Sequence, residues 1–169
     1  MPTLSPQERL QPALLDRLID DEPDKKVESR ESRVVSIRRL REAVLRDLAW
    51  LFNCTRPSDE ELDTERHPHV ARSTLAFGLP ALAGNTASGM DIAMLESRIH
   101  AAITEFEPRL VPETLKVEAK AVDKTLDHHN QIEVQIRGSL WAQPVPIEIL
   151  LKTEVDLESG QVEIQDLGG

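Results

Sequence analysis

The spacing of apolar residues changes along the chain from a helical period to a period of two. Before Pro108, apolar residues recur at intervals of three and four, which places them on one face of an α-helix. After Pro112, apolar residues alternate with charged or polar ones, as in strands with one buried face. The pattern predicts an α+β fold in which helices pack on one face of a small antiparallel sheet.

The helical pattern occurs in three segments. Leu10–Ile19 is amphipathic but too short to form a stable helix alone, Val34–Phe52 has the clearest pattern, and Ile92–Phe106 is the third. Ser88 and Asp91 have the spacing of a capping box, in which a hydroxyl and a carboxylate three residues apart each accept a free N–H of the first turn. We therefore expect the third helix to be capped at Ser88.

Period-two alternation predicts four strands near residues 115–121, 132–137, 147–155 and 162–164. Their connections are too short for helical crossovers, so the strands should be antiparallel. Pro144 and Pro146 cannot donate to a strand ladder, which predicts that the third strand starts at an edge or a corner. An unpaired edge matters because it can accept a strand from another chain.

Turn residues dominate between the second and third helical segments. Five prolines and glycines interrupt residues 53–85, at Pro57, Pro68, Gly78, Pro80 and Gly84. A pure loop of that length is unusual in a compact domain, so part of the segment should be short helix. Val70–Phe77 is the expected place for a short helical or extended piece.

The length of 169 residues fits one domain with a short appendage. Residues 20–26 are charged and contain Pro23, as in a linker. We expect residues 1–31 to form a short amphipathic helix followed by a charged linker, and residues 32–169 to form a single α+β domain. The apolar face of Leu10–Ile19 must be buried on this domain or on another protein, and the sequence leaves both possibilities open.

Charge and composition narrow the classes of partner. The chain has 20 basic and 30 acidic residues, a net charge of −10, which disfavours binding to nucleic acid. Aromatic residues make up 3%, too few for a surface on which bases or sugars stack. Six arginines lie between residues 30 and 47. They form either a solvated helix face or a docking strip for an acidic partner.

No metal, cofactor or membrane segment is expected. His67 and His69 flank a proline without a nearby carboxylate or thiol, and His128 and His129 lie at a turn, so both pairs are weak metal candidates. The single cysteine, Cys54, cannot form an internal disulfide, which fits a reducing compartment. The sequence shows no secretion signal and no apolar run long enough for a membrane span, so we expect a cytoplasmic protein without direct membrane insertion.

Glu107, Pro108 and Arg109 stand at the point where the helical period ends. Pro108 stops the helix and fixes its own φ, so Glu107 and Arg109 leave the junction in defined directions. The three residues are either a helix stop with two solvated charges or a preset pair of opposite charges at a joint of the fold.

Six motifs, in order and spacing, together resemble the TssE family. TssE proteins are small baseplate subunits of the bacterial type VI secretion system, similar to a wedge protein in the baseplate of contractile-tailed phages. The motifs are Leu14–Leu18, Leu45–Leu51, Phe77–Pro80, Phe106–Leu110, His129–Asn130 and Thr153–Gly160. The resemblance covers about residues 10 to 165, and only the stretch between Asp59 and Val70 fits poorly.

The resemblance implies a structural protein with no catalytic residues. TssE-like subunits join TssF and TssG in the baseplate wedge, together with TssK and the hub that carries the spike. They help to start polymerisation of the TssB/TssC sheath, in the cytoplasm, where partners dock the baseplate at the inner membrane. The family signature falls on Glu107, Pro108 and Arg109. The resemblance implies that these residues form a protein-interaction or structural core motif, in which Glu107 and Arg109 pair with each other or bind partner groups.

The alternative class is a lysozyme-like glycoside hydrolase acting on peptidoglycan. Such an enzyme needs two carboxylates across a sugar-binding cleft, one of them with a raised pKa, and Glu105 and Glu107 are the obvious candidates. However, Arg109 beside Glu107 favours the ionised carboxylate, which is the opposite of what a general acid requires. We therefore expect no enzyme activity.

Overall fold

The computed structural model describes residues 13–18, 37–83, 91–122, 130–142 and 146–168. Helices precede strands, as the sequence predicts, and the class is α+β. The helices are α1 (Leu14–Leu18), α2 (Ile37–Asn53) and α3 (Ile92–Phe106), with short 3-10 helices η2 (Pro68–Arg72), η3 (Thr74–Ala76) and η4 (Pro112–Thr114). The strands are β1 (Lys116–Ala121), β2 (Gln131–Leu140), β3 (Ile147–Asp156) and β4 (Val162–Asp166). In the described part of the chain, no helix is long and apolar enough to cross a membrane.

The four strands form one antiparallel sheet in the order β1-β2-β3-β4. The longest pairing joins β2 to β3, from Gln131 opposite Asp156 to Leu140 opposite Ile147. Burial alternates along β2, where Ile132, Val134 and Ile136 are buried and their neighbours are partly exposed. This confirms the predicted apolar face, because a slip of one residue would turn these side chains to solvent.

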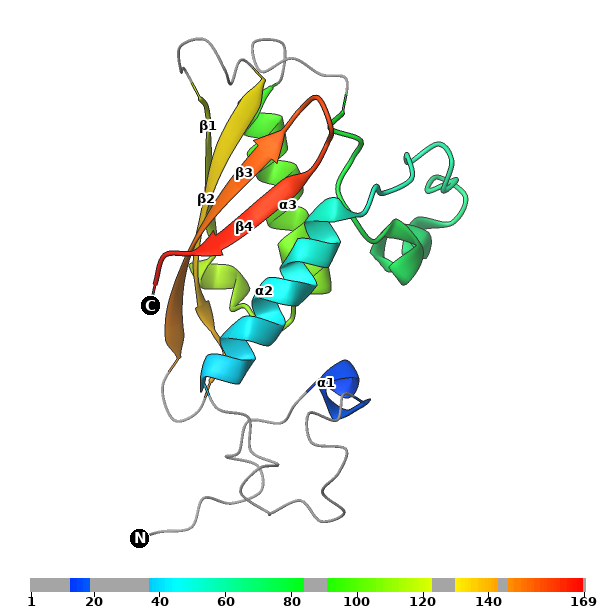
Figure 1. Cartoon of the computed structure of the whole chain (residues 1–169). Helices are drawn as coiled ribbons and strands as arrows, with labels where there is room; N and C mark the ends of the chain where they lie inside the picture. Colours follow the sequence, from blue (N-terminus) through cyan, green and yellow to red (C-terminus); the bar gives the residue numbers. More distant parts are fainter. Residues whose placement is uncertain (1–12, 19–36, 84–90, 123–129, 143–145, 169) are drawn as a thin grey trace, which may run out of the picture.

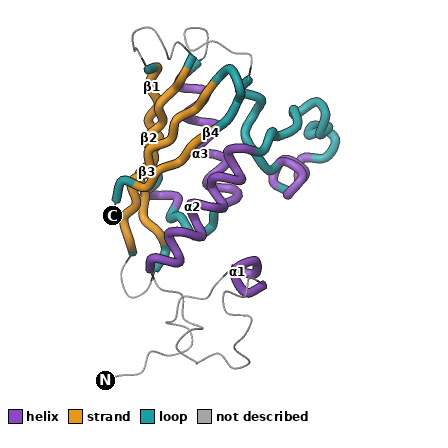
Figure 2. The backbone as a smooth tube through the Cα atoms, in the orientation of Figure 1, coloured by secondary structure: helices purple, strands orange, loops and turns teal. Residues whose placement is uncertain are grey.

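Helices α2 and α3 lie on the same side of the sheet, and the segment between them extends away from it (Figures 1 and 2). Contacts join α2 to β4 and α3 to β1, so the two helices divide the apolar face between them. The largest fully buried side chains come from both layers: Leu48, Leu51, Ile99, Ile103, Ile132, Ile136, Leu140 and Leu151. Burial of this shared face is what holds the helices on the sheet.

Side chains from the helices occupy part of both sheet edges. The Asn53 side-chain amide donates to the Val162 carbonyl over 2.9 Å, and its oxygen accepts the Val162 N–H over 3.0 Å. At the other edge, Glu96 Oε1 accepts the Ala119 N–H over 2.7 Å. An exposed edge invites pairing with another chain, and these contacts satisfy edge groups from within the subunit.

The predicted start of the third strand at an edge is confirmed for the part of the preceding loop that the structure describes. β3 begins at Ile147, directly after Pro146, and β4 pairs only with the segment Leu151–Val155. The first residues of β3 therefore lie beyond the reach of β4. There the Glu148 carbonyl accepts a hydrogen bond from Arg41 Nη2 over 3.3 Å.

The predicted capping of α3 is wrong in its register. The helix begins at Ile92 and Asp91 itself is the N-cap, with its carboxylate accepting the Met94 N–H over 3.0 Å. Aspartate is among the strongest N-cap residues, so it can start a helix without the upstream hydroxyl. Ser88 lies outside the described residues.

The irregular segment after α2 is closed by a contact between its two ends. Thr55 and Leu79 form a parallel bridge, and the Leu79 N–H donates to the Cys54 carbonyl over 2.9 Å. Gly78 has a φ of +119°, and a Cβ there would lie 2.4 Å from the Cys54 carbonyl oxygen, so only glycine fits. The short helix expected near Val70–Phe77 is present as η2 and η3.

Candidate functional site

The stretch from Glu107 to Leu110 connects the end of α3 to the end of β2. Glu107 is the C-cap of α3, and its N–H donates to the Ile103 carbonyl. Two residues later, the Arg109 carbonyl accepts the Trp141 N–H over 2.7 Å, just past the end of β2. Leu110 forms an antiparallel bridge with Leu140. Both ends of the stretch are therefore fastened to regular structure.

Glu107 and Arg109 form a two-pronged ion pair across Pro108. Arg109 donates from Nε to Glu107 Oε1 over 2.7 Å and from Nη2 to Oε2 over 2.5 Å, and its backbone N–H also donates to Oε1 over 3.1 Å. The Glu107 side chain is 3% exposed and that of Arg109 is 21% exposed. This parallel geometry is the strong form of an arginine–carboxylate contact.

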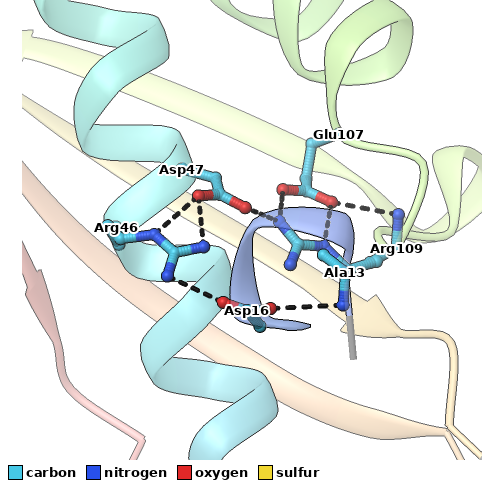
Figure 3. A network of polar contacts seen from close by, with 6 residues as sticks. All are labelled: Ala13, Asp16, Arg46, Asp47, Glu107 and Arg109. Atoms are coloured by element: carbon cyan, nitrogen blue, oxygen red, sulfur yellow. Dashed lines mark hydrogen bonds and ion pairs between the residues drawn. The ribbon is translucent and has the colours of Figure 1, made fainter. Parts of the chain in front are cut away.

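The ion pair continues into α2 and α1 (Figure 3). Arg109 Nη2 also donates to Asp47 Oδ2 over 2.5 Å. The other oxygen of Asp47 accepts from Arg46 Nε over 2.9 Å, and Arg46 Nη1 donates to Asp16 Oδ1 over 2.7 Å. We call these five residues, Glu107, Arg109, Asp47, Arg46 and Asp16, the charge network. It joins α1, α2 and the connection between α3 and the sheet.

Charges alternate along the network, and each guanidinium lies between carboxylates. Burial opposes the charged form of Arg109, but hydrogen bonds and charge from Glu107 and then Asp47 outweigh it and raise the pKa of Arg109. Burial likewise opposes the charged form of Arg46, and Asp16 and Asp47 outweigh it, so the pKa of Arg46 is raised. Both guanidiniums therefore stay charged at every physiological pH. The Arg46 guanidinium also lies 5.3 Å from the centroid of the Trp50 ring.

Phe77 supports the same joint from the irregular segment. Its ring packs edge-on against Phe106, the last residue of α3, with ring centroids 5.3 Å apart. Gly78 and Leu79, which follow Phe77, anchor that segment to residues 54–56. Two sequence motifs far apart in the chain thus meet next to Glu107.

The sequence predicted one part of the charge network and not the other. It placed Glu107, Pro108 and Arg109 at a joint and left open whether the two charges pair, and the structure shows that they do. It missed Asp47, Arg46 and Asp16. These residues lie 62 or more positions before Arg109 in the chain, on α1 and α2, so no periodicity relates them to Arg109. The one available signal was that all three fall inside motifs of the TssE resemblance.

The arginines of α2 do not form a free basic strip. Arg46 belongs to the charge network, and Arg41 pairs with Asp166 over 3.2 Å. Arg38 pairs with Glu42 over 2.8 Å on the exposed face. At least these three positions serve ion pairs within the subunit, which weakens the interpretation as a docking strip for an acidic partner. Arg30 and Arg33, which belong to the same predicted strip, lie outside the described residues.

The two carboxylates considered for glycoside hydrolysis have different surroundings. Both oxygens of Glu107 accept hydrogen bonds from Arg109, whereas Glu105 pairs with the exposed Arg72 over 3.1 Å. A buried carboxylate whose two oxygens are both occupied by a guanidinium is not free to contact a glycosidic oxygen. Among the described residues, no group of three histidine, cysteine or acidic side chains could hold a metal ion. That search includes His67 and His69, while His128 and His129 lie outside the described residues.

Comparison with known families gives a match to a family of baseplate proteins. The model of a family described as baseplate wedge protein gp25 matches residues 38–145, more than half of the chain. The matched range contains four of the five residues of the charge network, all but Asp16. No significant match was found among curated proteins or among solved structures.

Proposed function

Because the chain belongs to the baseplate wedge protein gp25 family, we propose that it is a TssE-type structural subunit of a type VI secretion system baseplate. TssE is the gp25-like protein of that system, which supports the TssE resemblance of the sequence. A baseplate wedge family implies assembly with other baseplate proteins. The proposed partners are TssF and TssG in the wedge, TssK and the spike hub, and the sheath subunits TssB and TssC, whose polymerisation the subunit helps to start.

The proposed setting is the cytoplasm, with the baseplate docked at the inner membrane through its partners. The proposed division of the chain is a short helical segment and linker in residues 1–31, followed by one wedge domain in residues 32–169. The family is one of structural baseplate proteins, which supports a role in assembly and not in catalysis.

The family match carries the proposed baseplate role, and the charge network at the joint between helices and sheet carries the role proposed for Glu107, Pro108 and Arg109. Glu107 is buried and both its oxygens are engaged by Arg109, so a partner group has no access to that carboxylate. We infer that Glu107, Pro108 and Arg109 act as a structural core motif. They hold α2, the end of α3 and the end of β2 in one arrangement, and partner surfaces depend on that arrangement.

The test is a pull-down from native cells with tagged wild type, Arg109→Ala and Arg38→Ala, reading TssF, TssG and the sheath subunits. Arg109→Ala leaves the buried Glu107 without its counter-charge, so the free energy of unfolding should fall by about 3 kcal/mol and partner recovery should fall with it. Arg38→Ala removes an exposed pair by the same change and should match wild type in recovery and in unfolding temperature.

Two results would contradict the proposal in different ways. If wild type recovers none of these partners, the baseplate assignment is wrong. If Arg109→Ala unfolds at the wild-type temperature but loses the partners, Arg109 is an interface residue and the inference of a structural core motif is wrong.

A further inference from the structure

Two of the three leucines of α1 are largely exposed to solvent. Leu14 and Leu18 are each 75% exposed and Leu15 is 36% exposed. An amphipathic helix normally packs through its apolar face. In the described part of the chain, α1 is joined to α2 by a polar contact, from Asp16 to Arg46. This leaves an apolar helix face presented to solvent.

One carboxylate both forms α1 and attaches it. Asp16 Oδ2 accepts the Ala13 N–H over 3.3 Å, which caps the start of the helix, and Oδ1 accepts from Arg46 Nη1 over 2.7 Å. A helix of five residues is not stable by itself in water. Its place on α2 therefore depends on Asp16, and Asp47 in turn orients the Arg46 guanidinium. The charge network thus holds α1 against α2 (Figure 3), and with it the backbone that carries Leu14 and Leu18.

We propose that α1 is a docking element that inserts Leu14 and Leu18 into an apolar groove of a neighbouring baseplate subunit. Exposed apolar residues held in a fixed orientation are typical of protein interaction sites. Helix-in-groove recognition uses residues spaced by three and four, the spacing of Leu14, Leu15 and Leu18. Prior ordering of the helix lowers the entropy cost of binding.

The charges of the chain define the rim of that groove. The sequence directly after α1 contains Asp20, Asp21, Glu22 and Asp24, so the groove should carry basic residues at its edge. A lipid surface is disfavoured, since interfacial helices carry a basic polar face and this chain has a net charge of −10. A second copy of the chain is disfavoured as the partner, because two chains of the same negative net charge repel each other. Two five-residue helices could also bury only a small area.

The identity of the partner rests on the proposed function, so the probe is the purified TssF–TssG pair. Its affinity is measured for the full chain as wild type, as the double variant Leu14→Ser/Leu18→Ser and as Asp16→Ala. The matched control is Leu75→Ser/Leu167→Ser, which changes two other leucines that are 65% and 51% exposed. Thermal unfolding of each variant shows whether the domain is intact.

We expect Leu14→Ser/Leu18→Ser to bind at least about tenfold more weakly with an unchanged unfolding temperature, since two apolar anchors are lost. The affinity of Asp16→Ala should fall several-fold, because the leucines of α1 remain but the helix must be ordered on binding. The control should bind like wild type. Equal affinity of the double variant and wild type would overturn the proposal, and equal affinity of Asp16→Ala and wild type would overturn the role of the charge network in it. Failure of wild type itself to bind would instead overturn the proposed function.

Discussion

Asp47 connects the two halves of the charge network, because it accepts hydrogen bonds from both arginines. One of its oxygens accepts from Arg109 and the other from Arg46, so it links the end of α3 to α1 through α2. Removing any one member leaves its neighbours partly buried without a full complement of opposite charge. The cost of such a change should therefore exceed that of breaking an exposed pair such as Arg38 and Glu42.

Thr153 shows a residue that works against stability. It is fully buried on β3, and within the described part of the chain its hydroxyl has no hydrogen-bond partner. Thr153→Val keeps the shape and the β-branch and removes the unsatisfied hydroxyl, so the free energy of unfolding should rise by about 1 kcal/mol. Urea denaturation should show a higher midpoint with an unchanged slope.

A second threonine provides the control for that change. The Thr114 hydroxyl donates to the Val111 carbonyl over 2.8 Å and accepts the Ser139 N–H over 2.9 Å. Thr114→Val loses both hydrogen bonds and should lower the denaturation midpoint. If Thr153→Val also lowers the midpoint, its hydroxyl is satisfied in solution and the prediction is wrong.

At the scale of elements, the irregular segment between α2 and α3 is held by Gly78. Because its φ is +119° and a Cβ would meet the Cys54 carbonyl, Gly78→Ala should lower the free energy of unfolding by at least about 2 kcal/mol. Gly138 lies in β2, where a Cβ would make only ordinary contacts, the nearest at 3.5 Å, so Gly138→Ala should be as stable as wild type. Equal stability of the two variants in thermal unfolding would contradict this account of the segment.

The elements that the sequence predicted well are those with a repeated pattern. α3 has the predicted bounds, and all four strands lie where the alternation of apolar and polar residues predicted them. Ile132 in β2 and Ile149 in β3 are examples of the buried apolar positions. The N-cap of α3 was predicted wrongly, because both Ser88 and Asp91 can cap a helix and spacing alone does not choose between them. Periodicity indicates which face of a helix is buried, but it does not identify the N-cap residue.

The contacts between elements could not be derived from the same patterns. The Asn53 amide that pairs with Val162 and the Asp16 carboxylate that binds Arg46 join residues that are 109 and 30 positions apart. Such contacts depend on how α1, α2 and the sheet pack in three dimensions. The sequence could identify Glu107 and Arg109 because Pro108 makes their geometry local.

For the molecule as a whole, the fold places a joint held by ion pairs where the helices meet the sheet, and it places α1, with exposed Leu14 and Leu18, beside α2. The sheet and two helices share one core, and the charge network ties α1 to it (Figures 1 and 3). This architecture fits a structural subunit of a baseplate wedge family. The central proposal is that Glu107 and Arg109 act together to hold that joint.

The most direct test of this claim is the coupling energy between Glu107 and Arg109 in urea denaturation. The free energy of unfolding is measured for wild type, Glu107→Ala, Arg109→Ala and the double variant. The two side chains share two hydrogen bonds, so we predict that the double variant is more stable than the sum of the single losses implies, by about 2 kcal/mol or more. Single losses that add up without coupling would contradict the account, because each residue would then act without the other.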